Sequence, residues 1–139
     1  MNRGQRIATV AVLAAIAAGI GAMQGFAGSV AATVAVTVKE FSLKPSTKIV
    51  PPGKVTFVVR NAGRVDHELV VLRTNHPAKE LDLASTGDVY EVGRAGRTSP
   101  IDAGKTQKLT VTLKVGHYAL ICNLPGHYRA GQFADFSVG

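Results

Sequence analysis

Alternation of apolar and polar residues is the feature of this chain that most limits its possible folds. The pattern is strictest in Lys108–Lys114, where Leu109, Val111 and Leu113 are separated by single polar residues. A period of two places every second side chain on the same face of a β-strand, so these three residues are expected to face a core. The same period recurs in 34–38, where every second residue is valine.

The other apolar runs are short and lie between turn residues. Further strands are expected at 41–43, 48–50, 54–60, 67–73, 118–122 and 133–138. About seven or eight short strands separated by turns predict an all-β fold, specifically a Greek-key β-sandwich. One short helix is expected over Pro77–Ala84, because proline is favoured in the first turn of a helix. The polar stretch 85–104 predicts a long connection between the two halves of the sandwich.

The first 27 residues have the composition of an export signal. Two arginines precede the apolar stretch 7–23, and the small residues that follow predict cleavage after Ala27, or after Ala31 or Ala32. The stretch also reaches the lower length limit of a membrane-spanning helix, so an uncleaved membrane anchor is the alternative. Both interpretations place residues 28–139 outside the cytoplasm, either free in the periplasm or anchored to the membrane.

The charge of the chain limits its partners only loosely. The formal net charge is +7, and the predicted signal accounts for two of the arginines. A moderate positive charge can steer a protein toward an acidic partner or an anionic surface, or can simply keep it soluble. No run combines basic with aromatic residues, so binding to nucleic acid is not predicted.

Cys122 is the only cysteine, so the chain cannot form an internal disulfide. A single cysteine in an exported protein can be a buried small residue, a free thiol, an intermolecular bridge or a metal ligand. Its surroundings favour the metal, because donors recur every five residues in Cys122-Asn-Leu-Pro-Gly-His127-Tyr-Arg-Ala-Gly-Gln132. The turn 123–126 brings Cys122 and His127 to the same place. A zinc finger is not indicated, since there is no second cysteine pair.

His67 is the best candidate for a further ligand, because it opens the apolar run 67–73. Two histidines and a cysteine with a weak axial group are the ligand set of a type 1 (blue) copper site. We therefore predict one copper ion, with His67, Cys122, His127 and Gln132 as metal ligands. An axial amide oxygen favours Cu(II) and predicts a lowered reduction potential. The alternatives are a surface role for Gln132, with the carbonyl of Asp66 or no group at the axial position.

The other two histidines are not expected to bind the metal. His117 alternates with Tyr118 and therefore faces away from the side of the strand that carries Cys122. His76 precedes Pro77 in a turn, where a solvated histidine is the usual situation.

From Lys54 to Val138 the chain resembles the cupredoxins, the superfamily of plastocyanin, azurin and pseudoazurin. The segment 116–132 is similar to the loop of small periplasmic members, in which Cys-Asn-Leu-Pro-Gly-His-Tyr is followed by Gly-Met. The resemblance implies ligation by His67, Cys122 and His127. Gln132 occupies the position of the axial methionine, as in stellacyanins. Glu68 is a second departure, because many members carry there an asparagine that braces the cysteine loop.

The resemblance also implies a function, namely transfer of single electrons between redox partners without enzymatic activity. In the family, electrons pass through the second histidine within an apolar patch, for which the neighbours of His127 are suitable: Leu124, Pro125, Tyr128 and Ala130. Partner contacts are expected to be transient and to include acidic proteins, with the chain itself a monomer.

Three other functions compete with electron transfer. A copper-delivery protein would be expected to expose methionines, but this chain has only Met1 and Met23, both in the predicted export segment. Cys122 and His127 could instead act as a thiol nucleophile and its base. A cupredoxin-fold module without electron transfer is the third alternative.

Overall fold

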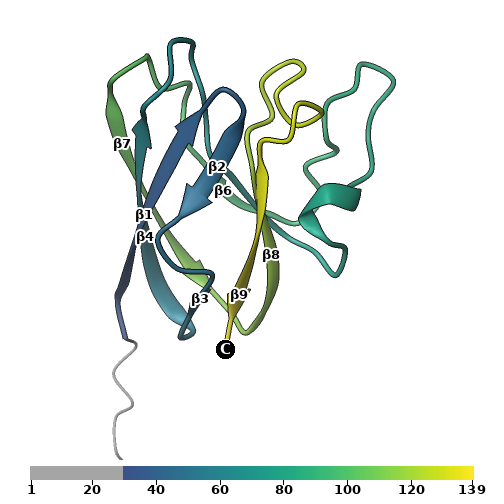
Figure 1. The fold of residues 1–139 in the computed structure, drawn as a ribbon. Coiled ribbons are helices and arrows are strands. Elements are labelled where there is room, and N and C mark those ends of the chain that lie inside the picture. Colours follow the sequence, from purple (N-terminus) through teal and green to yellow (C-terminus); the bar gives the residue numbers. More distant parts are fainter. Residues whose placement is uncertain (1–29) are drawn as a thin grey trace, which may run out of the picture.

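The computed structural model describes residues 30–139, so the predicted signal 1–27 and cleavage after Ala27 lie outside the described range. Within that range there are nine strands and a single 3-10 helix. The strands form two sheets that pack against each other (Figure 1). The four-stranded sheet has the order β2 (Ser42–Pro45), β1 (Ala32–Lys39), β4 (Gly53–Asn61) and β7 (Thr106–Leu113). The five-stranded sheet has the order β3 (Ile49–Val50), β9 (Phe133–Val138), β8 (Gly116–Ile121), β5 (Val70–Arg73) and β6 (Arg94–Arg97). The expected all-β sandwich is confirmed.

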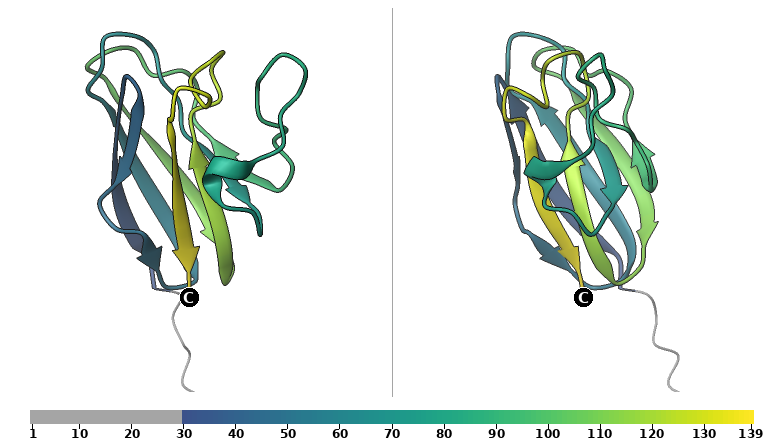
Figure 2. Two further views of the ribbon diagram at one scale, coloured as in Figure 1. Left: turned by 45° about the vertical axis from the view of Figure 1, so that its right-hand side comes forward. Right: turned by 90° about the vertical axis from the view of Figure 1, so that its right-hand side faces the viewer.

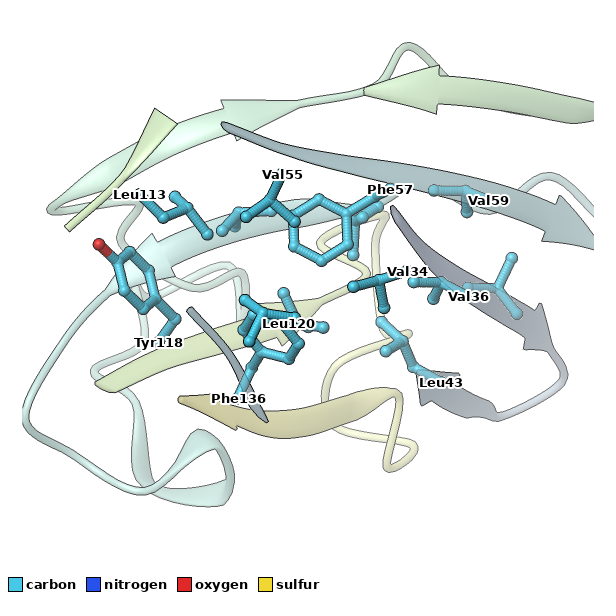
Figure 3. Close-up of a cluster of buried hydrophobic side chains, with 14 of the residues drawn as sticks. Val34, Val36, Leu43, Val55, Phe57, Val59, Leu113, Tyr118, Leu120 and Phe136 are labelled. Atoms are coloured by element: carbon cyan, nitrogen blue, oxygen red, sulfur yellow. The ribbon is translucent and has the colours of Figure 1, made fainter. Parts of the chain in front are cut away.

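The core lies between the two sheets and follows the period of two (Figure 3). The three valines of β1 are buried, and their neighbours along the strand are exposed. The rings of Phe57 on β4 and Phe136 on β9 meet across the layers, with centroids 5.5 Å apart at 63°. Leu113 is buried and the other two apolar residues of β7 pack against this core, as predicted.

Strand β8 separates two apolar clusters. Tyr118 and Leu120 face the core between the sheets, whereas Ala119 and Ile121 face a second cluster on the outer side of the five-stranded sheet. Figure 2 shows the 3-10 helix η1 (Ala78–Glu80) and the long connection after it on that outer side. Cys122 follows the last residue of β8, so the strand fixes its position.

The expected helix and the expected long connection both differ in the structure. The helix expected over 77–84 is only the three residues of η1, because Leu81 is extended and its N–H donates to the hydroxyl of Tyr128 (3.0 Å). The stretch 85–104 is more than a connection, since it contains β6, which pairs with β5.

The strand expected from His67 begins only at Val70. His67 instead forms an isolated bridge with Ile101, in which each N–H donates to the other residue's carbonyl (3.2 and 2.7 Å). The N–H of Glu68 points to the sulfur of Cys122 (3.4 Å) and not to the carbonyl of a neighbouring strand. None of the helices in residues 30–139 is long and apolar enough to cross a membrane.

Candidate metal centre

Three of the predicted ligands come together in the structure. Figure 1 shows the loop between β8 and β9, which carries two of them, at the end of the sandwich opposite the C-terminus. The donor atoms of His67, Cys122 and His127 all lie within 4.8 Å of one another. The Nδ1 atom of His127 is 3.2 Å from Nδ1 of His67 and 3.4 Å from Sγ of Cys122. Among residues 30–139 this is the one group of three histidine, cysteine or acidic side chains close enough to share an ion.

The loop that carries two of these donors is closed by its own backbone. The N–H of Cys122 donates to the carbonyl of Gln132 (3.1 Å), and the N–H of Gln132 donates to the carbonyl of His127 (3.2 Å). Directly outside this closure, Ile121 and Phe133 pair as the first residues of the β8–β9 ladder. Gly126 allows the turn within the loop because its φ of 80° is unfavourable for other residues. The sheet therefore fixes both ends of the loop.

Gln132 is buried in the centre of the site, so its interpretation as a surface residue is wrong. Its Nε2 lies 2.9 Å from Nδ1 of His67 and donates more weakly to the carbonyls of Lys39 and Ser42 (both 3.4 Å). Its Oε1 has no hydrogen-bond partner among the described residues. An unpaired buried carbonyl oxygen is unfavourable, so Oε1 is available to a bound cation.

Burial favours the uncharged forms of Cys122 and His127. Burial raises the pKa of the Cys122 thiol, and the N–H of Glu68 only partly opposes this. Burial, followed by the proximity of His67, lowers the pKa of His127. Since metal ions bind thiolate and neutral imidazole, binding would release the thiol proton. Two imidazoles, one thiolate and one weak oxygen donor fit copper better than magnesium or calcium.

Glu40 is a member of the site that sequence reasoning missed. Its Oε1 accepts hydrogen bonds from Nε2 of His67 (3.1 Å) and from the N–H groups of Arg64 (2.7 Å) and Val65 (2.9 Å). The bonds from Val65 and Arg64 hold the pKa of Glu40 at about 2. The next residue, Phe41, packs edge-on against His127 with ring centroids 5.2 Å apart. No spacing in the sequence connects these residues, which lie in the turn between β1 and β2, to the ligands.

A buried carboxylate lies beside the cysteine on the other side of the site. Glu68 is fully buried, and its Oε2 forms an ion pair with Arg97 (2.6 Å), whereas its Oε1 has no partner among residues 30–139. The loop is braced instead by Asn123, whose Oδ1 accepts from the N–H of Val89 (2.8 Å) and whose Nδ2 donates to Glu91 (3.0 Å). The brace therefore comes from the loop itself.

The structure places the two remaining histidines outside the cluster. His117 contacts the carbonyl of Thr74 and the carboxylate of Asp135, both at 2.9 Å. His76 is exposed in the turn before η1. Ligation by His67, Cys122, His127 and Gln132 stays a prediction, although the structure brings these four side chains together.

The chain is similar in sequence to a known family and to a known protein. Residues 41–139 match the family model described as the sulfocyanin (SoxE) domain. The copper-resistant cuproprotein CopI of Vibrio cholerae is 27% identical over 100 residues, which cover 71% of this chain but only 59% of that relative.

Two solved structures support the fold. Auracyanin of Roseiflexus castenholzii has 20% sequence identity and a TM-score of 0.58, over 81% of this chain and 99% of that one. Auracyanin A of Chloroflexus aurantiacus, described as a "blue" copper protein, has 18% identity and a TM-score of 0.57, over 78% of this chain and 99% of that one. The cupredoxin fold expected from the sequence is confirmed.

Proposed function

Because the chain belongs to the sulfocyanin (SoxE) domain family, we propose that it is an exported type 1 copper protein that carries single electrons between redox partners. The observation that carries the proposal is the convergence of the donor atoms of His67, Cys122 and His127 within 4.8 Å, near an oxygen of Gln132 that has no hydrogen-bond partner in residues 30–139. The Nδ1 atoms of both histidines and Sγ of Cys122 would hold one copper ion, with Oε1 of Gln132 as the weak axial donor. When bound, copper supplies a reversible Cu(II)/Cu(I) couple.

The burial of the donors favours a carrier over an enzyme. His67, Cys122 and Gln132 have no exposed surface, so a substrate could not reach them. His127 alone among the four is partly exposed, beside the exposed ring of Phe41. Electrons would therefore enter and leave through the edge of the His127 ring, in brief contacts with partner proteins. The same burial argues against a thiol nucleophile at Cys122.

Copper handling is the second candidate function. It is supported by the similarity to CopI, which is named a copper-resistant cuproprotein. Against it stands the absence of methionine from residues 30–139, because Met1 and Met23 are the only two in the chain. A donor loop closed by its own backbone hydrogen bonds and three fully buried donors favour retention of the ion over its release.

A copper titration distinguishes these functions. We expect the chain to develop an intense visible band that saturates at one Cu(II), with the compressed hyperfine splitting of a thiolate site in electron paramagnetic resonance. Electron transfer further requires that the reduced protein keep its copper in the presence of a competing Cu(I) chelator and regain the band on oxidation. A colourless complex, or loss of copper to the chelator on reduction, would favour copper handling.

The proposal places the copper domain outside the cytoplasm, as a monomer that meets its partners transiently. The support is the arginine-flanked apolar segment at the start of the sequence. Mass spectrometry of the protein from a membrane-free periplasmic extract tests this. A mature chain beginning at Gly28 would indicate cleavage after Ala27, and recovery only from membranes would indicate a retained anchor.

A further inference from the structure

The turn between β1 and β2 places a carboxylate against the outer nitrogen of His67. Oε1 of Glu40 lies 3.1 Å from Nε2 of His67 and also accepts the N–H groups of Arg64 and Val65. Three donors on one oxygen fix the position of the carboxylate. His67 is fully buried and Glu40 is only partly exposed, so Glu40 covers the solvent side of the ring.

The neighbours of the two ring nitrogens select one tautomer of His67. An ionised carboxylate can only accept hydrogen bonds, so Nε2 must carry the hydrogen. On the other side of the ring, the amide nitrogen of Gln132 can only donate, so Nδ1 must offer its lone pair (2.9 Å). Both contacts therefore leave Nδ1 free of hydrogen on the side that faces Cys122 and His127.

We propose that Glu40 is a positioning residue of the metal centre: it holds His67 in the tautomer that presents Nδ1 to the ion, and its charge favours Cu(II) over Cu(I). A carboxylate behind a ligating imidazole fixes the ring and raises its basicity. A nearby negative charge also stabilises a doubly charged ion more than a singly charged one. The second half of this inference depends on the proposed copper function, whereas the tautomer does not.

Gly63 provides a way to move the carboxylate without removing it. A Cβ atom at this position would overlap both carboxylate oxygens of Glu40 and would lie 2.7 Å from Oε2. The obstacle is the end of a flexible side chain, so Gly63→Ala would displace the carboxylate and leave the backbone in place. The charge of the protein would not change.

The tautomer can be measured in the metal-free chain by the nitrogen-15 shifts of its histidine rings. At a pH of about 8, where free imidazole side chains are neutral, we expect hydrogen on Nε2 of His67 and none on Nδ1. Glu40→Ala and Gly63→Ala should each shift the ring toward a mixture of tautomers. Hydrogen on Nδ1 in the unaltered protein would overturn the proposal, whatever the variants do.

The charge effect is tested by the copper-loaded protein. Glu40→Gln keeps an oxygen that can accept the three hydrogen bonds but removes the charge. We expect a loss of Cu(II) affinity of about 10–100-fold, with a smaller loss for Cu(I). Each tenfold decrease in the preference for Cu(II) over Cu(I) raises the reduction potential by about 59 mV. Glu80→Gln is the matched control, because Glu80 is exposed on η1 and, among the described residues, forms an ion pair with Lys79 alone.

The outcomes separate the two proposals. A potential in Glu40→Gln equal to that of Glu80→Gln would overturn the charge effect. Should Glu40→Gln not fold, Gly63→Ala serves the same measurement, because it displaces the charge from His67 and should also raise the potential. A protein that forms no thiolate–copper band but shows the expected tautomer would contradict the copper function and leave the role of Glu40 toward His67 intact.

Discussion

The amide nitrogen of Gln132 lies 2.9 Å from Nδ1 of His67, and neither side chain has any exposed surface. The contact joins the end of the cysteine loop to the connection after β4, across 65 residues of sequence. The amide nitrogen thus contacts the lone pair of a predicted ligand. Ligation by Oε1 would require the Gln132 amide to release His67 and turn, whereas the cysteine loop is already fixed at both ends by backbone hydrogen bonds and the sheet.

Replacement of Gln132 by methionine should raise the reduction potential. A thioether is a softer donor than an amide oxygen and favours Cu(I). We expect the preference for Cu(I) over Cu(II) to rise at least tenfold, which raises the reduction potential by at least about 59 mV, as measured by voltammetry. Gln107→Met is the control, because Gln107 lies on β7 and its amide donates to Ser99, away from the cluster. Equal potentials in Gln132→Met and the unaltered protein would show that Gln132 is not the axial ligand.

Replacement of Cys122 by serine should abolish the intense visible band. The hydroxyl can still accept the N–H of Glu68, so the loop should keep its conformation, but it cannot supply the thiolate that gives the colour. Absorption and electron paramagnetic resonance after addition of Cu(II) measure the effect, and circular dichroism checks the fold. A blue Cys122→Ser protein would refute the assignment of the centre.

Loss of Arg97 should destabilise the fold more than loss of a comparable surface arginine. Arg97→Met leaves the buried carboxylate of Glu68 without its ion pair, at an expected cost of about 3 kcal/mol in the free energy of unfolding. Arg94→Met removes an arginine from the more accessible Glu91 and should cost about 0–1 kcal/mol. Urea unfolding of both variants measures the difference, and equal costs would contradict the importance of the buried pair.

Tyr128 should make the fold sensitive to alkaline pH. Its hydroxyl donates to the carbonyl of Ala78 (2.8 Å) and accepts the N–H of Leu81 (3.0 Å), and burial raises its pKa. The pKa of Tyr128 in the folded protein lies above the unfolded value of about 10. The stabilisation that its hydroxyl gives the fold is therefore complete below about pH 10 and is lost as the pH rises through the folded pKa.

Tyr128→Phe tests this pH dependence. At neutral pH the variant should have a free energy of unfolding about 1–2 kcal/mol lower, because two hydrogen bonds are removed. On going to about pH 11, its free energy of unfolding should fall less than that of the unaltered protein. Tyr90→Phe is the control, since Tyr90 is exposed. Parallel losses of stability with pH in Tyr128→Phe and Tyr90→Phe would argue against the role of Tyr128.

Most of the sandwich could be predicted from the sequence, because a period of two reports directly which side chains face inward. The valines of β1 and the bounds of β9 were predicted in this way. The start of β5 could not be, since His67 and Leu69 pair with the distant residues Ile101 and Thr98. The length of η1 likewise depends on Tyr128, which is 47 residues from Leu81.

The sequence by itself determined that one loop carries Cys122, His127 and Gln132 at regular spacing, and that a strand on either side holds that loop. These are local properties, set by residue type and by strand period. Only the tertiary structure decided what surrounds the donors: Glu40 behind His67, Glu68 beside Cys122 and the burial of Gln132. Their positions follow from how the two sheets pack and how the turns at one end of the sandwich meet, and no local pattern records that arrangement.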